Sequence, residues 1–536
     1  MKIRSKHLAL FITIIPFITF YLTGHMTYME STWDDFPLRF VLSGEDKIGG
    51  PIIFTYTDYM VHQFEWFLNF LYRIVGQFFW YDIVLCLPLI TYFYLIYNEI
   101  YQSHKSNFDK VAISSFLFIF QSFLATNLHY SLSAIIGGFI LYLTLTNETY
   151  STPKNIVISL VAIIGFCIRF EFFILGFILA CSYHIIFTRF KLKVFFNRKL
   201  IIFIPIIILL ITHLKTALFY QPNLALNKQT LLLRKLSELS RFNVNKFLEN
   251  AEVLKKENNY SNFHLIRRYL YHISPDQLNN EKLETLLIET QKFPENKIDR
   301  IKSVILDRIK LTPKSIFLFF IFCLFLFFQI KRAIVLSVGS IFLYLSFICG
   351  IEILLKPMVN RHLMGFNLGA IGLIIYFCMN QHDKTTMRPK TSPIHLLLLT
   401  AIMFISIFQA NKFIKIDHIK TFHASEKLSL LENKIYLADQ NFPFHSLIKP
   451  FKTFNLNGPI PVPKNWTLFH GNIKAFFRSH QLKDQVIDNL LEGNITVIMD
   501  PRNISHIEKF IQYKNPNFAF QQISSTFMPI YVPITR

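Results

Sequence analysis

Long apolar runs, separated by polar segments, make up most of the first 410 residues. A helix of about 20 apolar residues crosses the hydrocarbon core of a bilayer, and these runs are close to that length. The sequence therefore predicts a mainly α protein, a polytopic transmembrane helical bundle. The eleven expected spans lie at residues 7–28, 81–98, 111–127, 130–146, 155–168, 170–188, 199–219, 315–330, 333–355, 363–380 and 393–410.

One apolar stretch, residues 155–188, is too long for a single span. As one helix its 34 residues would be about 50 Å long, whereas the hydrocarbon core is about 30 Å thick. We therefore expect two short helices that meet near Arg169, one of them tilted or re-entrant.

The basic residues predict the orientation. If every second short loop is cytoplasmic, Lys2, Arg4, Lys6, Lys105, Lys110, Lys154, the 189–199 cluster, Lys331, Arg332, Lys384, Arg388 and Lys390 all fall on one side. That distribution is the one the positive-inside rule requires. The N-terminus is then cytoplasmic, and the segments 29–80 and 220–313 are outer loops of a transmembrane domain, residues 1–410.

The last part, residues 411–536, has a different pattern. Strand-like stretches (KIYLAD, TVIMD, FMPIYVPI) alternate with helix-like ones (FFRSHQLKDQVIDNLLEG, SHIEKFIQY). We expect a small extracytoplasmic α/β domain here. It contains neither a GxGxxG nor a P-loop motif, so nothing predicts a nucleotide site.

Composition narrows the class of protein. Hydrophobic residues make up 52% and charged residues only 17%, against about 25% charged in soluble domains. An ordinary cytosolic enzyme and a disordered chain are excluded. The net charge is +21, and much of the excess of lysine and arginine lies beside the apolar runs. We therefore expect membrane lipids and lipid-linked phosphates as partners and no nucleic acid.

The cysteines and histidines give no metal signature. All six cysteines lie in apolar runs, and neither CxxC nor HExxH is present. His62 and His129 map to the outer side, but they stand apart in the sequence. We therefore expect no cofactor, and a divalent metal is unsupported.

Two adjacent carboxylates, Asp34 and Asp35, follow the first span behind Trp33. One interpretation is a helix cap, with Pro37 in the first turn. The other is a general base, because adjacent carboxylates repel and one of them is held with a raised pKa.

Cationic residues on the same predicted side are candidate phosphate ligands. Arg169 interrupts an apolar run, with Glu171 two residues later. It forms either a structural ion pair or an anion clamp. Arg361 and His362, between the ninth and tenth spans, either extend to the membrane interface or bind a lipid phosphate. Arg39 belongs to the same set.

Taken together, carboxylates and cations from distant parts of the chain are assigned to one membrane face, which suits group transfer from a lipid phosphate. In this plan the chain resembles the GT-C glycosyltransferases, which have a first helix, a long outer loop opening with acidic residues, many spans and an extracytoplasmic C-terminal domain. The residues that carry the resemblance are Trp33-Asp34-Asp35, Leu42-Ser43-Gly44, Trp80-Tyr81 and the arginine of GFCIRFEFF.

The resemblance implies a bacterial inner-membrane enzyme that moves a sugar from a polyprenyl-phosphate donor to a glycan or lipid acceptor. It makes Asp34 the base, Asp35 its partner or a substrate ligand, and Arg169 and Arg361 phosphate ligands. The second acid is Asp where the best-known members have Glu, so the donor sugar and the acceptor stay open. Two alternatives remain at this point: a transporter or flippase of a lipid-linked sugar, and a polysaccharide repeat-unit polymerase.

Overall fold

The structure, a computed structural model, describes residues 2–23, 25–28, 60–76, 78–103, 106–147, 152–188, 203–219, 333–354, 360–380, 435–438, 486–499, 501–512, 515–524 and 529–535, together with isolated residues that include Arg39 and Phe451.

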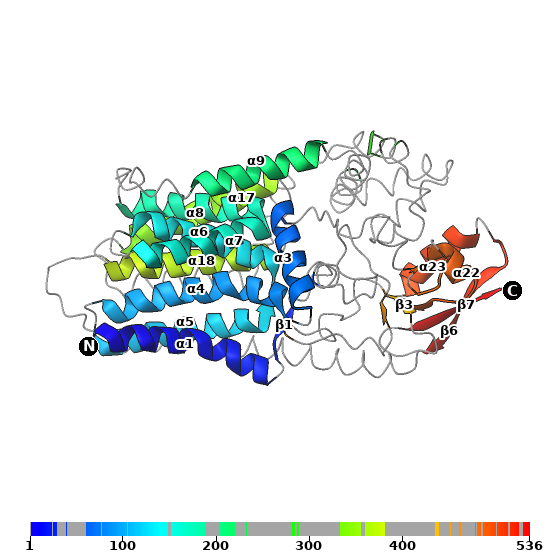
Figure 1. Cartoon of the computed structure of the whole chain (residues 1–536), viewed down its shortest axis with the longest axis horizontal. Helices are drawn as coiled ribbons and strands as arrows, with labels where there is room; N and C mark the ends of the chain where they lie inside the picture. Colours follow the sequence, from blue (N-terminus) through cyan, green and yellow to red (C-terminus); the bar gives the residue numbers. More distant parts are fainter. Residues whose placement is uncertain are drawn as a thin grey trace.

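Helices dominate the described part, as the apolar runs predict. Most of them lie side by side in one bundle (Figure 1). Their bounds are α1 (Lys2–Leu22), α3 (His62–Ile74), α4 (Trp80–Gln102), α5 (Asn107–Thr126), α6 (Tyr130–Thr146), α7 (Thr152–Ile168), α8 (Phe170–Thr188), α9 (Phe203–Phe219), α17 (Ala333–Leu354) and α18 (Asn360–Asn380).

Within the described residues, α4, α5 and α8 contain apolar stretches long enough to cross a membrane, and the other bundle helices contribute shorter apolar stretches. Their positions match nine of the eleven expected runs. The two others, 315–330 and 393–410, lie outside the described residues.

The break predicted near Arg169 is confirmed. Helix α7 ends at Ile168 and α8 begins at Phe170, so Arg169 occupies the turn between them. Both helices pack against α6.

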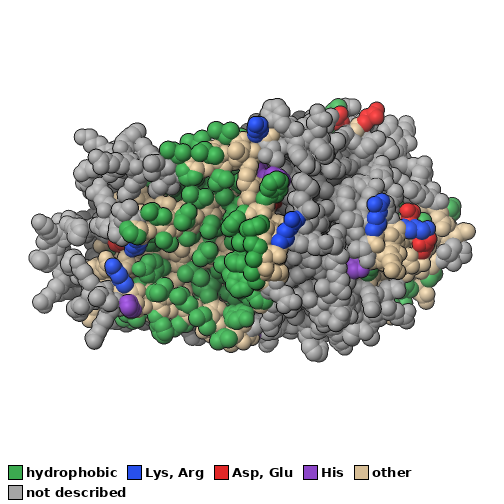
Figure 2. Space-filling view, in the orientation of Figure 1, with side chains coloured by type: hydrophobic (Ala, Val, Ile, Leu, Met, Phe, Trp, Pro, Cys, Tyr) green, Lys and Arg blue, Asp and Glu red, His purple; other side chains and the backbone are tan. Residues whose placement is uncertain are grey.

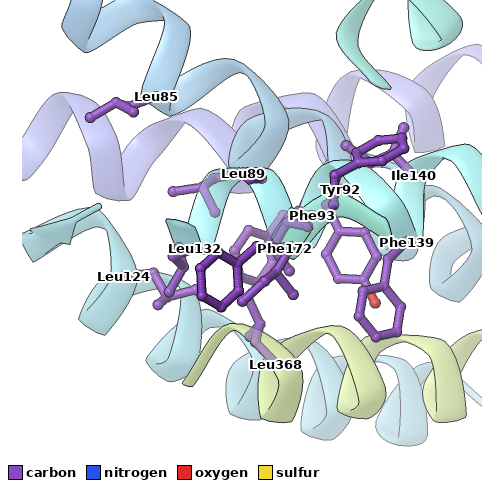
Figure 3. Close-up of a cluster of buried hydrophobic side chains, with 14 of the residues drawn as sticks. Leu85, Leu89, Tyr92, Phe93, Leu124, Leu132, Phe139, Ile140, Phe172 and Leu368 are labelled. Atoms are coloured by element: carbon purple, nitrogen blue, oxygen red, sulfur yellow. The ribbon is translucent and has the colours of Figure 1, made fainter. Parts of the chain in front are cut away.

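Helix α6 is the centre of the bundle, because residues Tyr130 to Leu145 are all buried. Glycines allow its close contact with its neighbours. A Cβ at Gly137 would lie 2.8 Å from the Cα of Gly165, and one at Gly138 would lie 2.2 Å from the carbonyl oxygen of Phe173. Figure 3 shows apolar side chains from several helices around it, including Leu89, Tyr92, Phe93, Phe139, Phe172 and Leu368.

Helix α3 departs from the expectation that residues 29–80 form a loop. It runs across one end of the bundle, nearly perpendicular to the other helices (Figure 1). Tyr72 on its inner face accepts a hydrogen bond from the backbone N–H of Tyr81 (3.0 Å). We call this end of the bundle the α3 end.

A short parallel bridge lies at the same end. Strand β1 (Thr27–Tyr28), just after α1, pairs with β2 (Asn127–Leu128), just before α6. The bridge therefore brings the start of the first polar segment beside the start of α6.

The C-terminal elements form a five-stranded sheet of order β4-β3-β5-β7-β6. The strands β4, β3 and β5 are parallel, whereas β7 is antiparallel to both β5 and β6. A separate apolar core, which includes Leu437, Val497 and Ile507, supports the sheet. The elements are β3 (Ile435–Ala438), β4 (Ile460–Pro461), α22 (Val486–Leu491), β5 (Thr496–Ile498), α23 (Pro501–Gln512), β6 (Phe518–Ser524) and β7 (Ile530–Thr535).

One C-terminal prediction needs correction. The stretch 476–493, expected to be a single helix, is interrupted at Gln481, whose φ of 59° is left-handed. Only α22 continues it, and Gly493 (φ 74°) then ends that helix as expected. The boundary expected at residue 411 lies outside the described residues.

Candidate functional site: a buried arginine at the α3 end

Arg169 is held by aromatic and acidic neighbours in the turn between α7 and α8. Its side chain is only 4% exposed. Nη1 donates a hydrogen bond to the hydroxyl of Tyr130 (2.7 Å), the first residue of α6. The guanidinium carbon lies 4.7 Å from the ring centre of Phe172. Because a buried cation is costly without such partners, these contacts hold the positive charge of Arg169 at the N-terminal end of α6.

His362, in the first turn of α18, shares an aromatic neighbour with Arg169. This histidine is buried, and the centre of its ring lies 4.0 Å from that of Phe172. Arg169 and His362 therefore contact the same aromatic ring although they are 193 residues apart in sequence. Arg361 also belongs to α18, but its side chain lies outside the described residues.

Glu171 completes the ion pair that the sequence offered as one interpretation of Arg169. Its Oε2 lies 3.4 Å from Nε of Arg169. The two side chains differ sharply in exposure, because Glu171 is 41% exposed and Arg169 4%. The side chain of Glu171 therefore reaches solvent, although its Oε2 is buried beside the guanidinium.

Arg39 has a different partner. Its Nη1 lies 3.5 Å from Oδ2 of Asp82 in the first turn of α4, and both side chains are buried. The same carboxylate oxygen accepts a hydrogen bond from the backbone N–H of Phe451 (2.9 Å). That Arg39 binds a phosphate therefore stays a prediction, since here its charge is balanced by Asp82.

Phe451, which lies in the sequence between strands β3 and β4 of the C-terminal sheet, contacts the bundle. Its ring lies 5.7 Å from Tyr21 at the end of α1 and 5.9 Å from Phe79. Together with Asp82, these contacts join α1, α4 and residue 451 at the α3 end.

A polar cluster lies next to the Arg169 turn. The backbone N–H of Val61 donates to the carbonyl of Cys167 (2.8 Å), and the backbone N–H of His62 donates to Nδ1 of His213 (3.2 Å). Nδ1 of His62 lies 3.7 Å from Oε2 of Glu65. These contacts hold the start of α3 against α7 and α9.

Little in the sequence indicated this polar cluster. His213 and Cys167 lie inside apolar runs, and Glu65 stands among aromatic residues. A histidine in the middle of an apolar run was the one available signal. Within the part of the chain that the structure describes, no group of three His, Cys, Asp or Glu side chains suits a metal ion.

Asp34 and Asp35, the expected catalytic pair, lie outside the described residues. The chain on either side of them is described at Tyr28, in β1, and at Arg39, beside Asp82. Both of these residues lie at the α3 end.

No protein-family model matches this chain, and searches of curated proteins and of solved structures found no significant similarity. The function is therefore argued from the chain's own residues.

Proposed function

We propose that the chain is an integral membrane glycosyltransferase that moves a sugar from a polyprenyl-phosphate carrier to an acceptor hydroxyl at the α3 end of the bundle. The observation that carries the proposal is the shared contact of Arg169 and His362 with Phe172. Two cationic candidates from distant segments, selected from the sequence as phosphate ligands, meet at one ring.

The Arg169–Glu171 pair supports an exchangeable anion site. Guanidinium binds carboxylate and phosphate through the same planar set of N–H donors. The side chain of Glu171 is partly exposed, although its Oε2 is buried against Arg169. In the proposal, rotation of this side chain toward solvent lets a lipid phosphate take the place of the carboxylate.

The β1–β2 bridge supports a base close to this site. Tyr28 pairs with Leu128, two residues before Tyr130, which accepts the hydrogen bond from Arg169. Asp34 follows Tyr28 by six residues, a reach of at most about 20 Å for an extended chain. This constraint favours Asp34 as the base, with Asp35 as its partner.

In the proposed reaction, the bond between the anomeric carbon and the phosphate oxygen breaks, and its electron pair stays with the lipid phosphate. The acceptor oxygen forms the new bond to the anomeric carbon. Its proton goes to the carboxylate of Asp34. Arg169 stabilises the negative charge that develops on the leaving phosphate.

The proposed orientation follows from the basic loops. Eleven spans cross a bacterial inner membrane, the N-terminus is cytoplasmic, and the α3 end and the C-terminal sheet are extracytoplasmic. The three long apolar helices of the described part support a membrane location.

The acid variants test the chemistry. Purified full-length protein in lipid vesicles is incubated with radiolabelled polyprenyl-phosphate sugars and a glycolipid extract of the source envelope. We expect Asp34→Asn or Asp35→Asn to abolish transfer while each variant still binds polyprenyl phosphate. Asp46→Asn, in the same polar segment, serves as the matched control. Full transfer by both acid variants, or lipid translocation with no transfer, would overturn the proposal.

The arginine variants test the phosphate site. We expect Arg169→Gln to weaken the binding of polyprenyl phosphate roughly 10- to 100-fold, the equivalent of one or two charge-assisted hydrogen bonds. The exposed Lys6→Gln near the start of α1, which also removes one positive charge, is the control, with unchanged affinity expected. Equal affinities of the two variants would exclude Arg169 as the phosphate ligand.

A further inference from the structure

Helix α3 carries an exposed apolar stripe of four large side chains on its outer face. Trp66, Phe67, Phe70 and Ile74 are 54%, 51%, 56% and 62% exposed. Because successive residues are rotated by about 100° around a helix, these four positions span an arc of about 100° of its surface. The residues His62, Phe64, Glu65, Leu68, Asn69 and Tyr72 are buried on the remaining surface.

The outward face of α3 differs from that of an ordinary surface helix, which faces water with polar residues. Its inner face buries both polar and apolar side chains, whereas aromatic rings face outward. An aromatic patch of this kind on a soluble surface marks an interaction site.

The stripe continues an apolar surface of the bundle. Helix α3 contacts α9, whose Ile211 and Leu214 are 59% and 46% exposed. Figure 2 shows hydrophobic side chains gathered over the bundle as far as the α3 end. Whatever covers the stripe must therefore also cover the exposed apolar sides of the neighbouring helices.

We infer that α3 lies in the headgroup region of the bilayer, with its apolar stripe directed into the boundary of the acyl chains. A helix perpendicular to the spans, with large aromatic residues on one face, has the geometry of an interfacial helix. Tryptophan is enriched at this depth. Arg73 in the last turn is exposed, and its guanidinium then reaches the lipid phosphates.

This placement determines the depth of the Arg169 site. The start of α3 is hydrogen-bonded to the end of α7 through Val61 and Cys167, and to α9 through His62 and His213. Arg169 follows Cys167 by two residues. A helix held at headgroup level therefore keeps Arg169 at the level of lipid phosphates, where a membrane-bound donor presents its own. The inference rests on the membrane location in the proposed function, but not on sugar transfer.

Tryptophan fluorescence tests the inference on the full chain. There are four tryptophans, Trp33, Trp66, Trp80 and Trp466. The variant W33F/W80F/W466F retains Trp66 alone, and it is reconstituted into phosphatidylcholine–phosphatidylglycerol vesicles. These vesicles contain lipids brominated near the headgroup, at mid-chain or near the chain end. We expect a loss of emission that is largest for bromine near the headgroup and smallest for bromine near the chain end.

A second variant, W33F/W66F/W80F, retains Trp466 in the segment expected outside the membrane, and acrylamide in the water is expected to quench it more than Trp66. Quenching of Trp66 by acrylamide but not by bromine would overturn the inference. Protection from both quenchers would also overturn it, because it indicates that protein covers the stripe.

If W33F/W80F/W466F fails to fold, the wild type is compared with Trp66→Phe, which should lose the part of the emission that bromine quenches. If that part is unchanged, the inference is wrong.

Vesicles of the same lipid composition that contain the wild-type chain are assayed in parallel for sugar transfer and for binding of polyprenyl phosphate. Transfer by the wild-type chain without bromine quenching of Trp66 would overturn the interfacial placement alone. Bromine quenching of Trp66, with neither transfer nor binding detected for the wild-type chain, would overturn the proposed function alone.

Discussion

At the scale of single residues, two buried arginines at the α3 end have different environments. Arg39 and Asp82 are both enclosed, and the carboxylate also accepts a backbone N–H. Arg169 is enclosed, but its partner Glu171 is partly exposed. The first arrangement suits a permanent structural pair, whereas for the second the proposed function requires the carboxylate to give way to a phosphate.

Removal of Asp82 is expected to be strongly destabilising. Asp82→Ala leaves the Arg39 guanidinium buried without its counter-charge, which typically costs about 3–5 kcal/mol. Asp82→Asn should cost less, because an amide oxygen still accepts the N–H of Phe451. Thermal unfolding in detergent measures both variants.

The double variant Arg39→Met with Asp82→Leu is the control for this prediction. Replacing both charges by apolar groups removes the unpaired cation, so we expect a smaller loss than in Asp82→Ala. A loss as large as the sum of the two single substitutions would show that the two charges are not coupled.

The pH dependence of stability is expected to have a contribution from His62. Burial lowers the pKa of this side chain below its ordinary value of 6.5. The unfolded chain therefore takes up a proton on His62 at a higher pH than the folded chain does. The contribution of His62 to the free energy of unfolding is fully present above about pH 6.5 and is lost as the pH falls through the pKa of the folded state.

His62→Gln tests this contribution, since the substitution retains the backbone N–H that binds His213. The midpoint of thermal unfolding is measured from about pH 8 down to pH 5. We expect a smaller acid-induced decrease in the variant than in the wild type. Parallel curves would contradict the assignment.

At the scale of elements, glycines set the spacing of α6 from its neighbours. A Cβ at Gly138 would lie 2.2 Å from the carbonyl oxygen of Phe173, and one at Gly176 would lie 2.3 Å from that of Ile135. Both obstacles are backbone atoms, which a rotamer change cannot move aside.

Gly138→Ala is therefore expected to force α6 and α8 apart and to lower stability by about 1–3 kcal/mol. Gly339→Ala is the matched control, because a Cβ at that position of α17 meets nothing within 4 Å. The control should be neutral or gain about 0.5–1 kcal/mol from the better helix propensity of alanine. Equal unfolding temperatures of the two variants would refute the close-packing argument.

The elements differ in how far the sequence predicted them. Apolar runs located the bundle helices, since burial in lipid or protein requires continuous apolar surface, and length alone predicted the break at Arg169. Helix α3 was missed because its 13 residues alternate polar and aromatic side chains within a segment taken as a loop. The C-terminal helix was extended too far, since nothing in the local pattern marked the left-handed Gln481.

The site was predicted less completely than the helices. Arg169 was selected because a charge is rare within an apolar run, and His362 because it stands beside Arg361 between two spans on the same predicted side. Their partners Tyr130 and Phe172 are ordinary components of apolar runs, so only the packing of distant helices identifies them. The pairing of Arg39 with Asp82 likewise depends on tertiary contacts. The roles of Asp34, Asp35 and Arg361 stay predictions.

At the scale of the whole molecule, the ends of the helices agree with the alternation expected from the basic loops. The C-terminal end of α1, the turn between α7 and α8, and the start of α18 share the α3 end, while Lys6 and Lys154 belong to helix starts at the opposite end (Figure 1).

Reporter fusions test the orientation. We expect a fusion after residue 103 or 147 to give cytoplasmic GFP fluorescence, and a fusion after residue 28, 357 or 536 to give alkaline phosphatase activity, which requires an extracytoplasmic location. The positive-inside distribution of lysine and arginine is the physical reason. Opposite signals from the fusions after residues 28 and 357 would separate Asp34 from His362 and exclude a shared site.

The enclosure of α6 also has a consequence for biogenesis. Its neighbours α7, α8 and α18 all come later in the chain, and α18 contributes Gly365 and Gly369 directly against Ile135 and Phe139. The newly made α6 must therefore wait beside the translocon or in lipid until residues up to about 380 have been synthesised. A nascent chain released before α18 is complete would leave the side of α6 that carries Ile135 and Phe139 without its glycine-lined partner helix, which makes such truncated products natural substrates for membrane quality control.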